Sequence, residues 1–230
     1  MLLNIDESEH DNHIYRIMSY DRFLELFDTK KNTLVSPNKW EDTFENYALK
    51  STLKFPDGTE VKLDTHHRLF GQCWTTSKAS DAIWRIYSHD KKSVRIRTTI
   101  NKLLMSLVIA NVNTSMTESC IGKVRYLSEK EITRLAKGAF TNTGQMTFGS
   151  LFRSLLVKRK AFKHEKEIRL IYLDWGYDLP KKDIYKYEID PHDLITQVMV
   201  DPRINYHEFK TIKNDIRKKT GYRGDLPLTL

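Results

Sequence analysis

Segments with strand-like and helix-like hydrophobic periodicity follow one another along this chain without a regular repeat, and this pattern most constrains its fold. Strand-like runs rich in β-branched and aromatic residues occur at 13–18, 33–35, 69–75, 93–97, 121–126, 165–173, 184–189 and 195–200. Helical spacing of apolar residues occurs at 21–27, 40–49, 79–88, 99–110, 148–159 and 206–219, and a capping box opens a further helix at Ser128. Because no strict strand–helix–strand repeat is present, we expect an α+β fold with a mixed or largely antiparallel sheet flanked by helices.

The 230 residues fit one domain, and 9 glycines and 6 prolines leave little material for a flexible linker. No internal repeat or domain boundary is evident, so we expect a single domain over residues 1–230. The turn signal at 55–58 and the polar stretches 111–119 and 141–149 predict loops.

The cysteines and the N-terminus indicate a cytoplasmic protein. Cys73 and Cys120 are too few for a disulfide framework or a four-thiolate zinc site, so we expect buried free thiols. The first residues are acidic, unlike a signal peptide. The longest apolar stretch, 103–110, is far shorter than the ~20 residues that cross a bilayer, so no membrane association is expected.

The formal net charge of +8 favours an anionic partner such as a nucleic acid. A basic cluster surrounds the end of the helix expected at 148–159, and its candidate nucleic-acid-binding residues are Arg153, Lys158, Arg159, Lys160 and Lys163. A solvated helix face is the competing interpretation. If nucleic acid is the partner, RNA or single-stranded DNA is favoured over a duplex, since a reactive base atom must be reachable.

Three motifs carry candidate chemistry. Tyr15-Arg16 lies in the first expected strand, where a guanidinium must find a partner and could clamp a phosphate, or else face solvent. Thr75-Thr76-Ser77 ends a strand; these hydroxyls could contact a ribose or simply cap the next helix. Glu165 and Glu167 are two apart in an expected strand and share a face, so one carboxyl pKa should rise if they lie in a cleft.

In this order, the arginine, the hydroxyl triplet and the E-x-E pair resemble one class of mono-ADP-ribosyltransferases. The 88 positions from Ser77 to Glu165 exceed the spacing expected for compact toxins of that class. A wider resemblance runs through five segments, Ile14–Arg16, Asn38–Glu45, Cys73–Thr75, Ala82–Tyr87 and His164–Arg169, which look like the bacterial "domain of unknown function two-nine-seven-one" family. Thr43 stands where that family has proline. Members of this family are often encoded near phage-defence genes, and this resemblance implies a toxin or abortive-infection role in phage defence.

The first resemblance implies an ADP-ribosyltransferase-like fold that uses NAD as substrate and transfers ADP-ribose to a macromolecule such as RNA. It implies Glu167 as the carboxylate that stabilises the ribosyl cation and Glu165 as a general base. Arg16 would hold the pyrophosphate, and Trp84 or Tyr87 would stack on the nicotinamide unless they are core aromatics. A possible antitoxin partner is also implied.

Two alternatives remain open. Asp42, Glu45, Glu165 and Glu167 could bind Mg²⁺ as a nuclease, with Lys166 nearby, although no compelling metal-nuclease spacing is present. The chain could also be a non-catalytic module that docks RNA or a protein through its basic helices.

Overall fold

The computed structural model describes residues 1–40, 42, 45, 49, 52–54, 60–62, 66–78, 81–138, 148–176 and 182–227. Most of the helix expected at 40–49, the turn at 55–58 and most of the loop at 141–149 lie outside these residues. The chain divides into two compact units, each built from three separate stretches. The first unit comprises Met1–Ile5, Thr33–Cys73 and Asn111–Tyr185; the second comprises Asp6–Asn32, Trp74–Ala110 and Lys186–Leu230. The expectation of a single domain stays a prediction.

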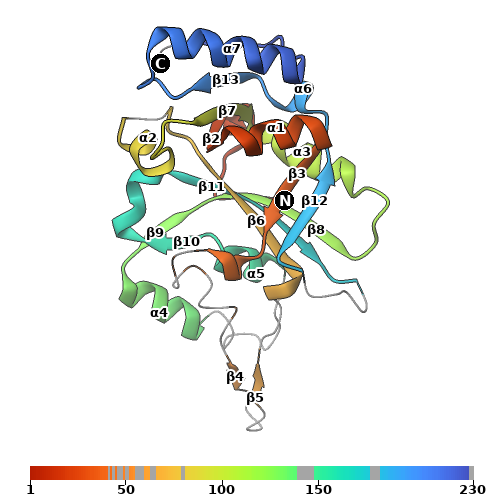
Figure 1. Ribbon diagram of the computed structural model, residues 1–230. Coiled ribbons are helices and arrows are strands. Elements are labelled where there is room, and N and C mark those ends of the chain that lie inside the picture. Colours follow the sequence, from red (N-terminus) through yellow and green to blue (C-terminus); the bar gives the residue numbers. More distant parts are fainter. Residues whose placement is uncertain are drawn as a thin grey trace. The chain divides into compact units, whose positions relative to one another are not determined.

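The first unit contains a mixed sheet in which β1 (Leu2–Leu3), β8 (Thr117–Lys123), β11 (Glu167–Asp174) and β6 (Leu69–Thr75) are neighbours in that order (Figure 1). β1 is parallel to β8, whereas β8 and β11 are antiparallel. β3 (Lys31–Val35) joins β6 through Val35 and Gly71 and also pairs with β12 (Ile184–Glu188). β11 is central and buried along most of its length, so polar side chains at its start need partners within the protein.

Two small sheets complete the strands of the first unit. β9 (Arg125–Leu127) is parallel to β10 (Val157–Arg159), and β4 (Thr52–Lys54) is antiparallel to β5 (Glu60–Lys62). The helices are α4 (Glu129–Gly138) and α5 (Phe148–Ser154), with 3₁₀ turns at η2 (Pro37–Lys39), η4 (His66–Arg68) and η5 (Lys160–Glu165).

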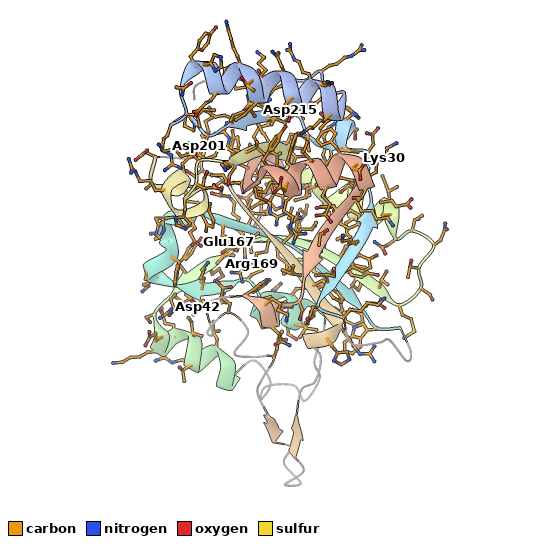
Figure 2. All side chains as sticks on the ribbon, in the orientation of Figure 1. Lys30, Asp42, Glu167, Arg169, Asp201 and Asp215 are labelled. Carbon is orange, nitrogen blue, oxygen red and sulfur yellow. The ribbon has the colours of Figure 1, made fainter. Side chains whose placement is uncertain are left out.

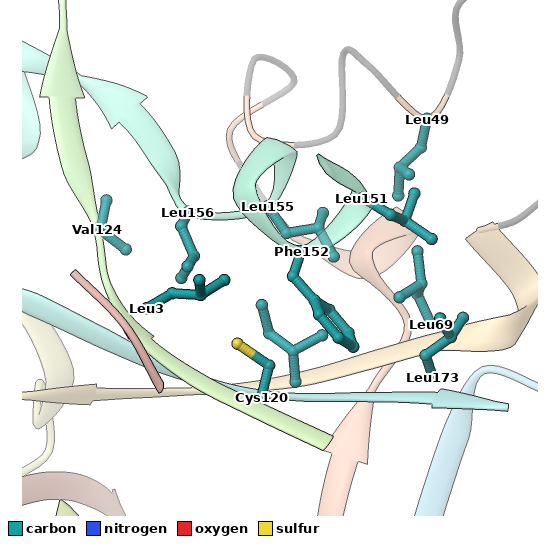
Figure 3. Close-up of a cluster of buried hydrophobic side chains, with 11 residues drawn as sticks. Leu3, Leu49, Leu69, Cys120, Val124, Leu151, Phe152, Leu155, Leu156 and Leu173 are labelled. Atoms are coloured by element: carbon teal, nitrogen blue, oxygen red, sulfur yellow. The ribbon is translucent and has the colours of Figure 1, made fainter. Parts of the chain in front are cut away.

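The core of the first unit forms where α5 and the chain after it cover one face of the sheet (Figure 3). Leu151, Phe152 and Leu155 are fully buried against Cys120 and Leu173 from β8 and β11. Each fully buried side chain of this size contributes about 1.5–3 kcal/mol through removal of apolar surface from water. This packing anchors the segment that leads into β10 and η5.

The second unit contains an antiparallel sheet in which the end of β6 is followed by β2 (His13–Ser19), β7 (Ser93–Thr99) and β13 (Gln197–Val200). Its helices are α1 (Tyr20–Thr29), α2 (Asp81–Tyr87), α3 (Ile100–Ala110), α6 (Pro191–Leu194) and α7 (Tyr206–Thr220), and a 3₁₀ turn, η1, spans Glu7–Glu9. Gly221 ends α7 in the left-handed conformation at φ 67°, as its position predicts.

The α+β class, with a mixed or antiparallel sheet flanked by helices, is confirmed. Three element predictions were wrong in detail. The helix expected at 148–159 ends at Ser154, and 157–159 is strand β10. The strand expected at 165–173 begins only at Glu167, and the one at 121–126 is two strands separated at Val124. Among the described helices, none is long and apolar enough to cross a membrane.

Candidate functional site

A buried ion pair opens strand β11. Arg169 donates from Nε to Glu167 Oε1 at 2.9 Å and from Nη2 to Oε2 at 3.0 Å, which is a bidentate arrangement. A third nitrogen, Nη1, donates to the Leu155 carbonyl at 2.6 Å, and the guanidinium lies 4.3 Å from the Trp40 ring centroid. The Arg169 side chain is 0% exposed and that of Glu167 is 5% exposed. Figure 2 labels both residues at the start of this strand.

Three carboxylates converge on one ammonium group beside this pair. Lys158 Nζ lies 2.6 Å from Glu165 Oε2, 2.9 Å from Glu45 Oε1 and 3.3 Å from Glu167 Oε2. Glu45 Oε1 also lies 3.1 Å from Arg169 Nη2, so the two cations share it. We call these five residues, Glu45, Lys158, Glu165, Glu167 and Arg169, the carboxylate cluster.

A second ion pair borders the carboxylate cluster. Arg159 Nε lies 3.1 Å from Asp42 Oδ2, and Arg159 Nη1 lies 3.7 Å from Glu129 Oε1. The ring of Phe162 faces both neighbouring cations, with its centroid 4.7 Å from Lys158 Nζ and 5.3 Å from Arg159 Cζ. Asp42 therefore binds a guanidinium rather than joining the three glutamates.

The backbone explains how Glu165 and Glu167 reach the same lysine. Glu165 ends the 3₁₀ turn η5, and Lys166 is left-handed at φ 44° before β11 begins. The Glu167 N–H donates to the Tyr126 hydroxyl at 2.7 Å. The expectation that both glutamates share one face of a strand is wrong, because Glu165 precedes the strand. Their carboxylates meet instead through Lys158.

The electrostatics of the carboxylate cluster favour the charged forms of Glu167 and Lys158. Burial opposes ionisation of Glu167, but Arg169 and Lys158 outweigh burial and hold the pKa of Glu167 below its usual range. Burial likewise opposes the charge on Lys158, yet the neighbouring carboxylates raise the pKa of that lysine. The rise in pKa expected from two repelling carboxylates is therefore absent at Glu167, because cations separate them.

Cys73, which is partly exposed, also contacts this site. It donates a hydrogen bond to Glu167, and burial raises the pKa of Cys73 far above its usual range. Cys120 is buried in the core of the same unit. Both cysteines are free, as expected, but only Cys120 is buried, whereas Cys73 is partly exposed.

In the second unit, Tyr15 and Arg16 lie on opposite faces of β2. Tyr15 is 4% exposed and pairs in register with Thr75 and Arg97. Arg16 pairs with Ile96, which is 1% exposed. The Cβ of Arg16 therefore lies on the same face of the sheet as the buried Ile14 and Ile96. Its role as a phosphate clamp stays a prediction.

The remaining ligand candidates of the second unit differ in exposure. Thr75 Oγ1 accepts a hydrogen bond from the Ser77 N–H at 3.0 Å, and Thr75, Thr76 and Ser77 are all partly exposed. Trp84 is 0% exposed and packs with Ile83 and Met199, so it presents no ring face to a ligand and fits the alternative of a core aromatic. Tyr87 is 49% exposed and can present its ring.

The basic residues proposed to bind nucleic acid do not all face solvent. Arg153, Lys160 and Lys163 are exposed, and Arg159 is partly exposed. The assignment of Lys158 is wrong as a surface contact, since its side chain is 11% exposed and its ammonium is bound by three carboxylates. One signal of its burial was its place at the end of the apolar run Leu155–Val157.

The carboxylates of the metal-site alternative lie near one another but face cations. Asp42 binds Arg159, while Glu45, Glu165 and Glu167 surround Lys158. Within the ranges that the structure describes, no group of three or more His, Cys, Asp and Glu side chains is arranged to hold a metal ion.

Comparisons with known proteins return structural likeness only. No family model matches the chain, and the resemblance to the "domain of unknown function two-nine-seven-one" family stays a prediction. No curated protein matches it either. Solved structures of DarT from Thermus sp. 2.9 are similar at 12% identity: the complex with ADP-ribosylated ssDNA has a TM-score of 0.40 over 98% of this chain and 96% of that one. The NAD⁺ complex has a TM-score of 0.39 over 94% of each chain, and the carba-NAD⁺ complex one of 0.38 over 96% and 95%.

Proposed function

We propose that this chain is an ADP-ribosyltransferase, which uses NAD⁺ as substrate and transfers ADP-ribose to a macromolecule, with nucleic acid as the favoured acceptor. The observation that carries the proposal is the buried carboxylate cluster, in which the E-x-E pair of the sequence motif meets on Lys158.

The charge balance of the carboxylate cluster suits a reaction that develops positive charge. Three glutamates face two cations, so the cluster carries one net negative charge. In a buried setting this charge is weakly screened and interacts strongly with a nearby cation. Cleavage of the bond between ribose and nicotinamide leaves positive charge on the ribose, and preorganised opposite charge is a large source of catalysis for such a step.

Glu167 is the proposed catalytic carboxylate. Its pKa is held below the usual range, so it is ionised at neutral pH and ready to accept a hydrogen bond from a ribose hydroxyl. Arg169 is a positioning residue, since two hydrogen bonds to Glu167 fix the direction of that carboxylate. Trp40 packs on the guanidinium and restrains it in turn.

Glu165 is the proposed base toward the acceptor. Its side chain is 14% exposed, against 5% for Glu45 and Glu167, so it is the most accessible carboxylate of the cluster. The acceptor bond to ribose forms as the nicotinamide bond breaks; neutral nicotinamide leaves with the bonding electrons, and the acceptor proton passes to Glu165. Arg153, Lys160 and Lys163 are the exposed cations of the same unit proposed to contact a phosphate backbone. The roles of Arg16 and Tyr87 toward NAD⁺ stay predictions from the sequence.

The test is transfer of label from ³²P-NAD⁺ to single-stranded DNA, RNA or protein, with release of free ADP-ribose followed in parallel. Glu167→Gln keeps the shape of the side chain but removes its charge, and we expect transfer to fall at least about a hundredfold. The matched control is Glu25→Gln, which removes a partly exposed glutamate paired with Lys186 in the second unit. Circular dichroism confirms that both variants are folded.

The result that overturns the proposal is the absence of NAD⁺ turnover with every acceptor class, or equal turnover by the Glu167→Gln variant. Release of free ADP-ribose without labelling of any acceptor would show that the protein hydrolyses NAD⁺ instead of transferring ADP-ribose. Nucleic-acid cleavage that EDTA abolishes would favour the nuclease instead. Salt-sensitive RNA binding without any product would favour the non-catalytic module.

A further inference from the structure

The second unit carries a group of cations that its described residues do not neutralise. Arg95 and Arg97 are two apart in β7 and share a face, opposite Val94 and Ile96. Lys78 follows β6, and His13 begins β2. Across the part of the chain that the structure describes, none of the four, His13, Lys78, Arg95 and Arg97, has a carboxylate within ion-pair distance.

Arg95 is the buried member of this group. The residue is 4% exposed, and its guanidinium lies 4.8 Å from the Tyr15 ring centroid. Its amino groups donate to the Lys78 carbonyl and, at 3.0 Å, to Gln197 Oε1. Its Nε is buried without a hydrogen-bond partner. All of these contacts are neutral, so the charge of Arg95 lacks a counter-ion, and burial of an unpaired charge is costly.

The other cations of the group are more exposed than Arg95. Arg97 Nε donates to Thr196 Oγ1 at 3.1 Å, which is again a neutral partner. Burial together with the charges of Arg97 and Lys78 lowers the pKa of His13, which shows that these three groups lie within electrostatic reach. His13 and Lys78 are exposed and Arg97 is partly exposed, so a solvent-borne anion can approach these groups.

We propose that Arg95, Arg97 and Lys78 form a binding site for the phosphate groups of a phosphorylated ligand, with His13 at its edge. The planar guanidinium fork matches phosphate oxygens. Two arginines two steps apart on a strand are separated by about 6.6 Å, which suits two neighbouring phosphates. The pyrophosphate of a dinucleotide and the phosphodiesters of a nucleic acid share this chemistry. The site does not depend on the transferase reaction proposed above.

Calorimetric titration with inorganic pyrophosphate, ADP-ribose and an oligothymidylate tests the site. We expect the wild-type protein to bind at least one of these probes, and the Arg95→Met variant to bind at least tenfold more weakly, as loss of a charged hydrogen bond implies. Arg22→Met is the matched control, since Arg22 is an exposed arginine of the same unit with a 69% exposed side chain. Binding of pyrophosphate and ADP-ribose alone supports a dinucleotide; binding of the oligonucleotide alone supports a nucleic acid.

Thermal unfolding separates a binding role from a structural one. Without ligand, Arg95→Met removes an uncompensated buried charge, so its Tm should equal or exceed that of the wild type. A structural arginine would lower Tm instead. A third measurement needs no variant: the NMR-detected pKa of His13, which faces Arg97 and Lys78, should rise when pyrophosphate binds to the wild-type protein. Failure of all three probes to bind the wild type overturns the proposal. So does a marked loss of Tm in Arg95→Met, or equal affinity in the two proteins.

Discussion

Removal of the central ammonium of the carboxylate cluster gives the sharpest test of how the first unit is held together. Lys158→Met keeps an apolar stem but leaves Glu45, Glu165 and Glu167 without the cation that separates them. Removing one partner of a buried ion pair costs about 3–5 kcal/mol. The Lys158 side chain is 11% exposed, so solvent screening reduces this cost only slightly. We expect the free energy of unfolding to fall by about 3 kcal/mol or more at pH 7, a large part of the about 5–15 kcal/mol of a typical domain.

The pKa shifts predict in which direction the stability difference between the wild type and Lys158→Met changes with pH. In the wild type, the folded pKa of Glu167 is depressed, so its stabilisation is present above the unfolded pKa and is lost as pH falls through the folded value. In Lys158→Met, Arg169 still contacts Glu167, but loss of the ammonium raises the folded pKa of Glu167 relative to the wild type. The difference in stability between the two proteins should therefore be greatest at neutral pH and shrink as the pH falls below about 4.5.

Urea unfolding followed by circular dichroism at pH 7 and pH 4 measures this difference. Lys186→Met is the matched control: Lys186 pairs with Glu25 at 2.8 Å, but both side chains are about one-third exposed at 35% and 34%, so its loss should cost under about 1 kcal/mol. Equal stability losses in the two variants, or a loss in Lys158→Met that does not change between the two pH values, would refute the electrostatic account.

Two further outcomes follow from the first unit. Gly71→Ala should lower the free energy of unfolding by about 1–3 kcal/mol in urea titrations, because the new Cβ would lie 2.6 Å from Trp40 Cζ2 and displace the ring that packs on Arg169; an unchanged midpoint would contradict this packing. Burial raises the pKa of Cys120 to about 12 and that of Cys73 still higher, so iodoacetamide at pH 8 should label neither thiol in the folded protein and both in urea; labelling of the native protein at the rate of a free thiol would show that they are accessible.

Local chemistry explains why several element predictions were confirmed. Residues 69–75 combine apolar and aromatic side chains and form β6, and the Ser128 capping box begins α4 with Glu131 Oε2 2.7 Å from the Ser128 nitrogen. Gly221 ends α7 at a positive φ. These features depend on residues close in sequence, so periodicity and cap chemistry are sufficient to identify them.

Tertiary packing determines the secondary structure of segments whose sequence pattern fits both a helix and a strand. The apolar run Leu155–Val157 continues the helical pattern of 148–154, yet its side chains are buried in the core, and Val157 begins β10, where it pairs with Arg125 of β9. Periodicity alone does not separate a buried helix from a buried strand in so short a run. The same segment carries Lys158 into the carboxylate cluster, and this is why a residue expected on a basic surface became a buried partner of three glutamates.

The order of motifs along the chain, Arg16, the hydroxyls at 75–77 and the E-x-E pair, was available from the sequence by itself, as were the α+β class and the free thiols. The sequence did not reveal that Glu45, more than a hundred positions before Glu165, contacts the same ammonium, or that Arg95 is buried with no carboxylate partner among the described residues. Ion pairs and desolvation depend on distance in space and on exclusion of water, and both arise only when segments remote in sequence pack together.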